Sequence, residues 1–239
     1  MIIIEGDKLM VLADIEKPQW APDVSGGLAF ETKYIWRGQD MVDGPVLQPE
    51  AALSKYGITL SYWGNVRMDG SVSRWTEHDY AVDYTAYIGK LLDMPALDKL
   101  GASTGNIFYI FPENSGKEFH SEEFYFGFSY DCLLRPWFKC YVDYARGAGS
   151  YLQFGIGHTF NMPGGIGAKL ATTLAYNAGQ WGYGYKAAPI LFSGEICIPV
   201  LKYFTVAPNI YYSLALDRTD DDAAYGSEFF GGVKISAAY

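Results

Sequence analysis

The sequence predicts an all-β chain that folds as a closed antiparallel up-and-down transmembrane β-barrel of about twelve strands. Three observations support this prediction. Apolar and polar residues alternate along most of the chain, turn residues separate the alternating segments, and the connections are alternately long and short. Alternation gives each strand one apolar wall and one mixed polar wall, because successive side chains of a strand point to opposite faces.

Residues 151–160 show the alternation most clearly. Leu152, Phe154 and Ile156 share one face of this segment, and Gln153 lies on the other. A helical membrane span needs about 20 apolar residues in a row, and the sequence contains no such run. A barrel distributes its apolar residues over alternate positions, so contact with lipid does not require a continuous apolar stretch.

Twelve segments have the length and pattern of strands. An even number is typical of single-chain bacterial barrels, and a tilted strand needs about 9–11 residues to cross a bilayer. The stretch 91–99 is predicted to form a short turn of helix between two strands. The predicted strands are residues 26–37, 45–54, 57–66, 77–90, 101–111, 121–131, 137–146, 150–160, 165–177, 188–198, 202–217 and 228–239.

The connections and the N-terminus suggest the domain organisation. Odd-numbered connections are mostly long and polar, and even-numbered ones are mostly short, which fits outer loops and periplasmic turns. We therefore expect the barrel at residues 25–239 and a separate N-terminal segment at residues 1–24. A short apolar run at residues 9–13 follows two acidic residues. We interpret the segment as a signal-peptide remnant with a periplasmic lead-in, and expect the complete signal upstream of Met1.

The composition excludes some functions. The net charge of −9 argues against nucleic acid as a partner, because binding phosphates requires a basic face. A bridge between Cys132 and Cys140 across a predicted turn is possible, but we favour Cys132, Cys140 and Cys197 as small residues in strands or turns. Their spacing is not that of a metal site, and we expect neither a metal nor a cofactor.

The apolar faces favour lipid over a dry protein core. A soluble all-β protein would guard its surface and edges with charged side chains, yet Lys and Arg total only 18. Aromatic residues also collect near the predicted strand ends, as expected for girdles at the two membrane interfaces. These aromatic residues are Tyr34, Trp36, Tyr56, Tyr62, Trp63, Trp137, Tyr144, Tyr203, Tyr211 and Tyr212.

The chain resembles the TorF-like or Gcw_chp family of bacterial outer-membrane barrels. The resemblance covers most of the chain after residue 25 and implies a porin-like barrel without agreed catalytic residues. It rests on short motifs at Tyr34–Gly38, Pro45–Pro49, Gly57–Gly64, Glu77–Tyr80, Phe108–Pro112, Glu123–Gly127 and Ser150–Gly155.

Facing the apolar walls outward puts a set of charged residues inside the barrel, because an Arg or Lys facing lipid at the midplane would cost about 2–4 kcal/mol. These residues would either line an aqueous pathway and tune its selectivity, or pair with one another in a plugged lumen. We predict the following lumen-lining residues: Glu31, Lys33, Arg37, Asp83, Glu123, Lys139, Asp143, Lys169, Glu195 and Lys234.

Two charged loops have alternative interpretations. Arg37 and Gly38 are predicted where the first strand meets an outer loop. There Arg37 would attract anions at a pore mouth or, as we favour, pair with a nearby carboxylate. Residues 217–222 are acidic and would bind a divalent cation or, as we favour, form a solvated loop.

The predicted function is a porin-like channel for passive transport of small polar solutes in the bacterial outer membrane. The first alternative is a structural or adhesive closed barrel that acts through its extracellular loops. The second is a lipid-modifying enzyme or protease, but His78, His120 and His158 lie in no catalytic motif, so we expect no enzyme. The expected partners are outer-membrane lipid, small polar solutes, periplasmic chaperones and the barrel-assembly machinery.

Overall fold

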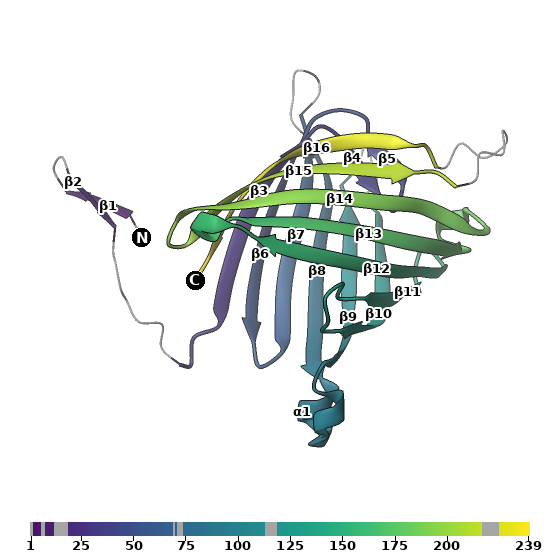
Figure 1. Cartoon of the computed structure of the whole chain (residues 1–239). Coiled ribbons are helices and arrows are strands. Elements are labelled where there is room, and N and C mark those ends of the chain that lie inside the picture. The colour runs from purple at the N-terminus through teal and green to yellow at the C-terminus, as the bar shows by residue number, and fades with distance from the viewer. Residues whose placement is uncertain are drawn as a thin grey trace.

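The computed structural model describes residues 2–5, 8–11, 19–68, 70, 74–112, 119–216 and 225–239. Twelve of the described strands form one closed barrel, in which each strand pairs antiparallel with its neighbours (Figure 1). The predicted fold class is therefore confirmed. The barrel strands are β3 (Asp23–Glu31), β6 (Val46–Lys55), β7 (Ile58–Arg67), β8 (Arg74–Tyr87), β9 (Leu100–Phe111), β10 (Phe119–Tyr130), β11 (Trp137–Asp143), β12 (Gly149–Asn161), β13 (Gly167–Ala178), β14 (Tyr185–Leu201), β15 (Phe204–Leu214) and β16 (Glu228–Ala238).

The remaining described elements are short. No helix in the described part of the chain is long and apolar enough to cross a membrane. The helical turn predicted at residues 91–99 is present as two pieces that begin earlier, at Ile88. The short elements are β1 (Ile2–Glu5), β2 (Lys8–Val11), β4 (Tyr34–Trp36), β5 (Gln39–Val42), α1 (Ile88–Leu92), η1 (Pro95–Leu97), η2 (Pro163–Gly165) and η3 (Gln180–Gly182).

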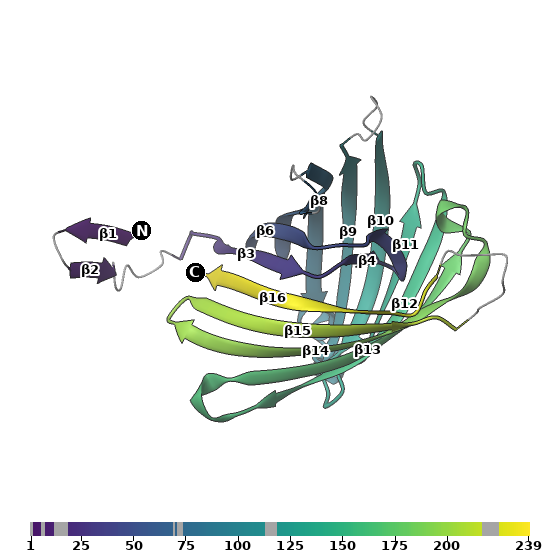
Figure 2. The same cartoon turned by 90° about the horizontal axis from the view of Figure 1, so that it is seen from above.

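The first and last barrel strands close the sheet. β16 pairs antiparallel with β3, and the seam ends in two reciprocal backbone hydrogen bonds between Val24 and Tyr239, of 2.8 and 2.9 Å. Among the twelve described barrel strands, closure leaves no strand without a partner on either side. The strands β13–β16 cross the direction of β6–β8 steeply in Figure 1 and that of β8–β10 in Figure 2, as expected for tilted, staggered strands in a closed barrel.

The outer wall of the barrel is apolar. In β10, Phe124, Phe126 and Phe128 are 45%, 40% and 49% exposed, whereas Glu123 and Tyr125 at the alternate positions are buried. The same period of two continues around the barrel through the cross-strand pairs. Exposed phenylalanines in such numbers are unfavourable in water and favourable in hydrocarbon, so the outer wall fits a lipid environment.

The two ends of the barrel differ as the sequence predicts. One end carries the long connections, and we call it the loop end. The other carries the Tyr56–Gly57 turn, α1 and η1, the connection at 131–136, η2 and the turn at 202–203, and we call it the turn end. The first barrel strand, β3, starts at Asp23. The signal-peptide interpretation stays a prediction, because residues 12–18 lie outside the described part.

The first predicted strand, 26–37, is wrong in its second half. β3 ends at Glu31, and the chain then forms the separate hairpin β4–β5. Arg37 and Gly38 are its two-residue turn, with φ of 51° and 83°. Both values are positive, as a tight type I′ hairpin turn requires. Apart from Thr32 and Ile35, alternation continues through residues 28–37, so the period of two alone does not reveal the break after Glu31.

The aromatic girdle prediction is also wrong in part. Tyr34 is buried in the β4–β5 hairpin, and its ring lies 5.3 Å from that of Trp63 on the inner wall. Tyr56, Tyr144 and Tyr212 are 84%, 55% and 40% exposed and do lie outside. Aromatic residues favour strand ends for two reasons, lipid interfaces and packing inside, and spacing does not separate them.

Candidate functional site

The β4–β5 hairpin lies inside the barrel at its loop end. Its turn residue Arg37 contacts Glu123 of β10, Tyr141 of β11, Tyr151 of β12 and Gln180 of η3. Both views place the hairpin within the outline of the barrel strands (Figures 1 and 2). The first long connection of the chain therefore folds inward and narrows the lumen.

A buried ion pair anchors the hairpin to the wall. The Arg37 Nη1 and Nη2 atoms donate to Glu123 Oε1 and Oε2 at 2.6 and 2.8 Å, a bidentate arrangement. The Arg37 side chain is 7% exposed and that of Glu123 is fully buried. Gln180 accepts from Arg37 Nη1 and donates to Glu123 Oε1, both at 2.5 Å, and the Tyr109 hydroxyl donates to Glu123 Oε2 at 2.7 Å. Each carboxylate oxygen therefore has two donors.

Aromatic rings surround the same guanidinium. Its central carbon lies 4.5 Å from the ring centroids of Trp36 and Tyr141, and 4.6 Å from that of Tyr151. A cation over an aromatic face is stabilised most where water is excluded, as it is here. The planar, permanently charged guanidinium suits both the bidentate pair and the ring contacts, so a lysine could not replace it.

The turn of the hairpin also fits closely against β14. A Cβ atom on Gly38 would lie 2.4 Å from Pro189 Cγ, and the φ of Gly38 is positive. Only glycine satisfies both conditions. A cavity of about 70 Å³ remains beside the turn, between Arg37, Tyr151 and the inner walls of β12–β15. The hairpin therefore fills most of the space around its turn.

The predicted lumen charges, apart from Lys33 and Arg37, lie on the inward positions of their strands, as the cross-strand pairs place them. Lys33 follows β3, and Arg37 lies in the hairpin. Arg37 does pair with a carboxylate, but inside the lumen rather than at a strand end. Most of the others also have polar partners: Glu31 with Asn209 at 2.8 Å, Lys33 with Asp43 and Glu228 at 2.9 Å, Asp143 with Ser121 at 2.7 Å, Lys169 with Glu195 at 2.7 Å, and Lys234 with Glu50 at 2.5 Å.

Two predicted lumen residues, Asp83 and Lys139, lie away from the hairpin. Both line a cavity of about 350 Å³ in the half of the lumen near the turn end. Asp83 accepts hydrogen bonds from the Tyr125 and Thr85 hydroxyls, and the Lys139 ammonium lies 4.7 Å from the Tyr125 ring centroid. Neither makes an ion pair with a described residue.

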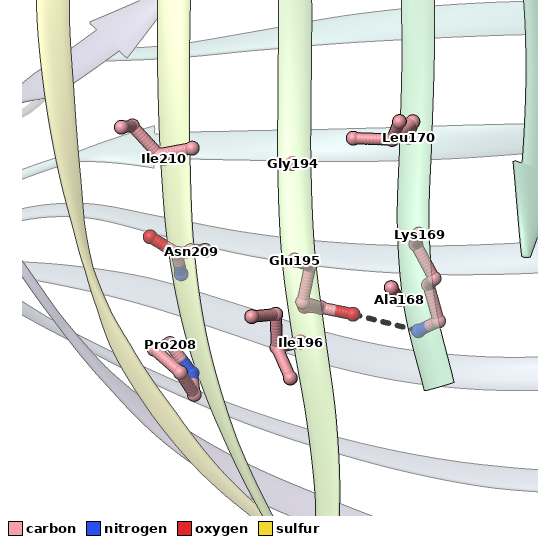
Figure 3. Close-up of a pocket in the computed structure, with 9 residues that line it drawn as sticks. All are labelled: Ala168, Lys169, Leu170, Gly194, Glu195, Ile196, Pro208, Asn209 and Ile210. Carbon is pink, nitrogen blue, oxygen red and sulfur yellow. Dashed lines mark hydrogen bonds and ion pairs between the residues drawn. The ribbon is translucent and has the colours of Figure 1, made fainter. Parts of the chain in front are cut away.

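A larger hollow lies on the outer wall, outside the lumen (Figure 3). Gly194 leaves a gap between Leu170 and Ile210, which are 57% and 50% exposed. Lys169 and Glu195 form their ion pair beside this hollow, from the inward positions of β13 and β14 (Figure 3). The lining of the hollow is almost entirely apolar, and it therefore belongs to the lipid-facing surface.

Sequence reasoning missed several residues of the hairpin site. Gln180 lies in a predicted outer loop, and Tyr109, Tyr141 and Tyr151 are inward aromatic residues among many. The one local signal for the inward fold is the glycine of Arg37-Gly38, which permits a two-residue hairpin turn. The partners of Arg37 come from strands far away in the sequence, and no local pattern brings them together.

None of the three histidines contacts Arg37 or lines the cavities beside the hairpin and near the turn end. His78 contacts the Tyr62 hydroxyl at 3.0 Å and stacks on Trp75, and the His158 Nδ1 lies 2.7 Å from the Leu133 carbonyl oxygen. His120 is exposed at the start of β10. The three cysteines are free, and the described residues contain no cluster suited to a metal ion. The acidic residues 217–222 lie outside the described part.

Comparisons with known proteins identify the fold. No family model and no curated protein sequence matches the chain. The NanC porin structure has a TM-score of 0.54 at 14% identity, over 91% of this chain and 99% of that one. The COG4313 outer membrane channel from Pseudomonas putida F1 has a TM-score of 0.52 at 8% identity, over 96% of this chain and 100% of that one. The chain has the fold of bacterial outer-membrane β-barrels, and its apolar outer wall agrees with that location.

Proposed function

We propose that the protein is a porin-like channel that lets small polar solutes cross the outer membrane passively. The observation that carries the proposal is a closed barrel with an apolar outer wall, whose inner wall bears charged and hydroxyl side chains and leaves an open cavity of about 350 Å³ with charges of both signs in its lining. Polar side chains on an inner wall stabilise hydrated solutes and set selectivity among them. We also propose that the chain belongs to the TorF-like family, on the motifs given above.

The β4–β5 hairpin forms the constriction of this channel. It narrows the loop end, and the bidentate pair of Arg37 with Glu123 holds it against the wall. Because these two charges neutralise each other, the hairpin limits solutes mainly by size. The unpaired charges Asp83 and Lys139 act on solutes farther along the lumen. Passage therefore combines a size limit at one end with a polar cavity at the other.

Conductance of purified, folded protein in planar bilayers tests the proposal. The natural chain should give discrete current steps in potassium chloride. Glu31 lies opposite Val46 in the β3–β6 ladder, so an Asn-Gly turn can replace residues 32–45 and keep that ladder. The replacement removes two backbone hydrogen bonds at the end of the wall, from Thr32 to the Gly231 carbonyl and from Met68 to the Pro45 carbonyl. Because this variant lacks the hairpin, we expect its unit conductance to rise about twofold or more.

A folded protein that never conducts, with and without the hairpin, would contradict the channel and favour the closed structural barrel. A conducting protein whose current steps do not change on removal of the hairpin would leave the channel standing and contradict the constriction. The matched control replaces the Tyr56–Gly57 turn with Asn-Gly, because that turn lies at the other end and has the same two-residue geometry. Its conductance should equal that of the natural chain.

We propose that the protein has no enzymatic activity. Replacing His78, His120 and His158 together with alanine should leave conductance unchanged, because all three lie away from the lumen site. The natural chain and the triple variant would be compared in lipase, deacylase and protease assays. An activity present in the natural chain and lost in the variant would overturn this part of the proposal.

A further inference from the structure

The cavity near the turn end contains two opposite charges that do not pair with each other. Lys139 of β11 and Asp83 of β8 both line it. No carboxylate of the described residues lies within ion-pair distance of Lys139, and no cation within that distance of Asp83. In the rest of the lumen, by contrast, Arg37, Lys169 and Lys234 are each paired.

Glycines keep this cavity open. Three large inward side chains lie flat against a glycine on the neighbouring strand: Trp137 against Gly155, Lys139 against Gly127, and Tyr125 against Gly105. A Cβ on these glycines would lie 2.3 Å from Trp137 Cε2, 2.7 Å from Lys139 Cγ and 2.7 Å from Tyr125 Cε1. The wall therefore accommodates the three side chains and leaves the space in front of them free.

The two charges are held in place. The Tyr125 and Thr85 hydroxyls donate to opposite oxygens of the Asp83 carboxylate, which orients it and leaves lone pairs for a further donor. The Lys139 stem lies along Gly127, and its ammonium sits beside the Tyr125 ring with its hydrogen-bond donors available to a ligand. Tyr125 thus contacts both groups and fixes the separation between the positive and negative ends.

The remaining lining combines hydroxyl groups with apolar surface. Thr59, Ser103 and Ser129 supply hydroxyl groups that donate and accept hydrogen bonds. Trp137, Phe128 and Phe138 supply aromatic surface. A volume of about 350 Å³ is at the lower end of the range for small-molecule sites. The cavity therefore fits a small molecule with polar groups and a modest apolar part.

We infer that this cavity binds zwitterionic solutes of the α-amino acid class. The ligand carboxylate pairs with Lys139, the ligand ammonium pairs with Asp83, and an aliphatic side chain packs on Trp137. A simple anion would be attracted by Lys139 but repelled by Asp83. A simple cation would be attracted by Asp83 but repelled by Lys139. Only a ligand with both charges satisfies both groups. This inference names the solute class of the proposed channel and rests on that function only for its biological meaning.

Equilibrium binding to the full chain in detergent micelles tests the inference without requiring transport. The probes are L-alanine, propionate and propylammonium, which share a three-carbon skeleton and differ in charge. Isothermal titration and saturation-transfer NMR would measure their affinities. We expect L-alanine to bind at least about tenfold more tightly than either single-charge probe, corresponding to one additional charge-assisted contact.

Two variants test the assigned contacts. Lys139→Met and Asp83→Asn each remove one charge at similar side-chain size, and each should weaken L-alanine binding about tenfold or more. Lys139→Met should also bind propylammonium more tightly than propionate, because Asp83 is then the only charge that lines the cavity. The matched controls are Lys90→Met in α1 and Asp131→Asn in the exposed turn after β10, which should leave binding unchanged. Circular dichroism would verify that every variant keeps its β structure.

Equal affinity for the three probes, no measurable L-alanine binding, or unchanged binding in both lumen variants would each overturn the inference. The outcomes separate it from the channel itself. A protein that conducts potassium chloride but does not distinguish L-alanine from propionate keeps the proposed function and loses the inference. A protein that binds L-alanine as expected but never conducts keeps the inference and loses the channel.

Discussion

The two halves of the lumen use the same inner wall in opposite ways. At the loop end the chain's own hairpin fills the space, and Glu123 receives four hydrogen bonds from Arg37, Gln180 and Tyr109. At the turn end Asp83 and Lys139 line a cavity and have no ionic partner among the described residues. Charged side chains that pair with other residues of the chain fix the hairpin in place. Charged side chains that face a cavity are available to bind solutes.

The largest expected effect comes from breaking the pair at the loop end. Arg37→Met leaves Glu123 buried without its cation, which costs about 3–5 kcal/mol. We expect the hairpin to detach while the barrel ladders persist. Hydrogen exchange of the Gln39–Val42 amides would measure this, and exchange should accelerate more than about a hundredfold.

The double variant Arg37→Met, Glu123→Gln is the control, because it also removes the buried negative charge. It should recover part of the lost protection. Exchange of the Gln39–Val42 amides that is equally slow in the natural chain and in Arg37→Met would show that the ion pair does not hold the hairpin.

Gly38→Ala should have an intermediate effect. The positive φ costs a non-glycine residue about 1–2 kcal/mol, and the new methyl group would meet Pro189. Gly164→Ala is the matched control, since Gly164 has a φ of 79° with no atom near its Cβ position. Chemical denaturation would detect the conformational cost in both variants, and hydrogen exchange of the hairpin should accelerate only in Gly38→Ala. Equal exchange in the two variants would contradict the close fit to β14.

The smallest expected effect concerns ion selectivity at the turn end. Lys139→Met leaves Asp83 as the unpaired charge of the cavity, so the permeability ratio of potassium to chloride should rise about twofold. Reversal potentials under a salt gradient would measure the ratio. Lys90→Met, which lies outside the lumen, should leave it unchanged. A ratio that does not change in Lys139→Met would mean that the cavity is not on the ion pathway.

The strands and the barrel could be predicted because the pattern that indicates them lies within each short segment of the sequence. A period of two is visible within each segment, and Phe154 and Leu170 are exposed on the outer wall as the sequence indicates. The inward hairpin could not be predicted, because Tyr34–Trp36 continues the alternation of β3. The hairpin lies inside the barrel because it contacts residues such as Glu123, which are distant in the sequence.

The two halves of the candidate site illustrate the same limit. The sequence indicates which charged residues face inward, since that follows from each strand's own pattern. It does not indicate which of them pair, because pairing depends on the register between strands and on the path of the first loop. Lys169 and Glu195 become neighbours through the β13–β14 ladder, whereas Lys139 lies opposite Gly127 and is left free to face the cavity.

The seam between β3 and β16 has a consequence for the order of assembly. The partner of the first barrel strand is the last barrel strand, so β3 keeps one edge of backbone donors and acceptors unpaired until β16 has been synthesised. Until then the incomplete sheet exposes both an open edge and its lipid-facing phenylalanines. Membrane insertion therefore has to be coordinated with the pairing of β3 and β16 rather than proceed one strand at a time from β3 onward.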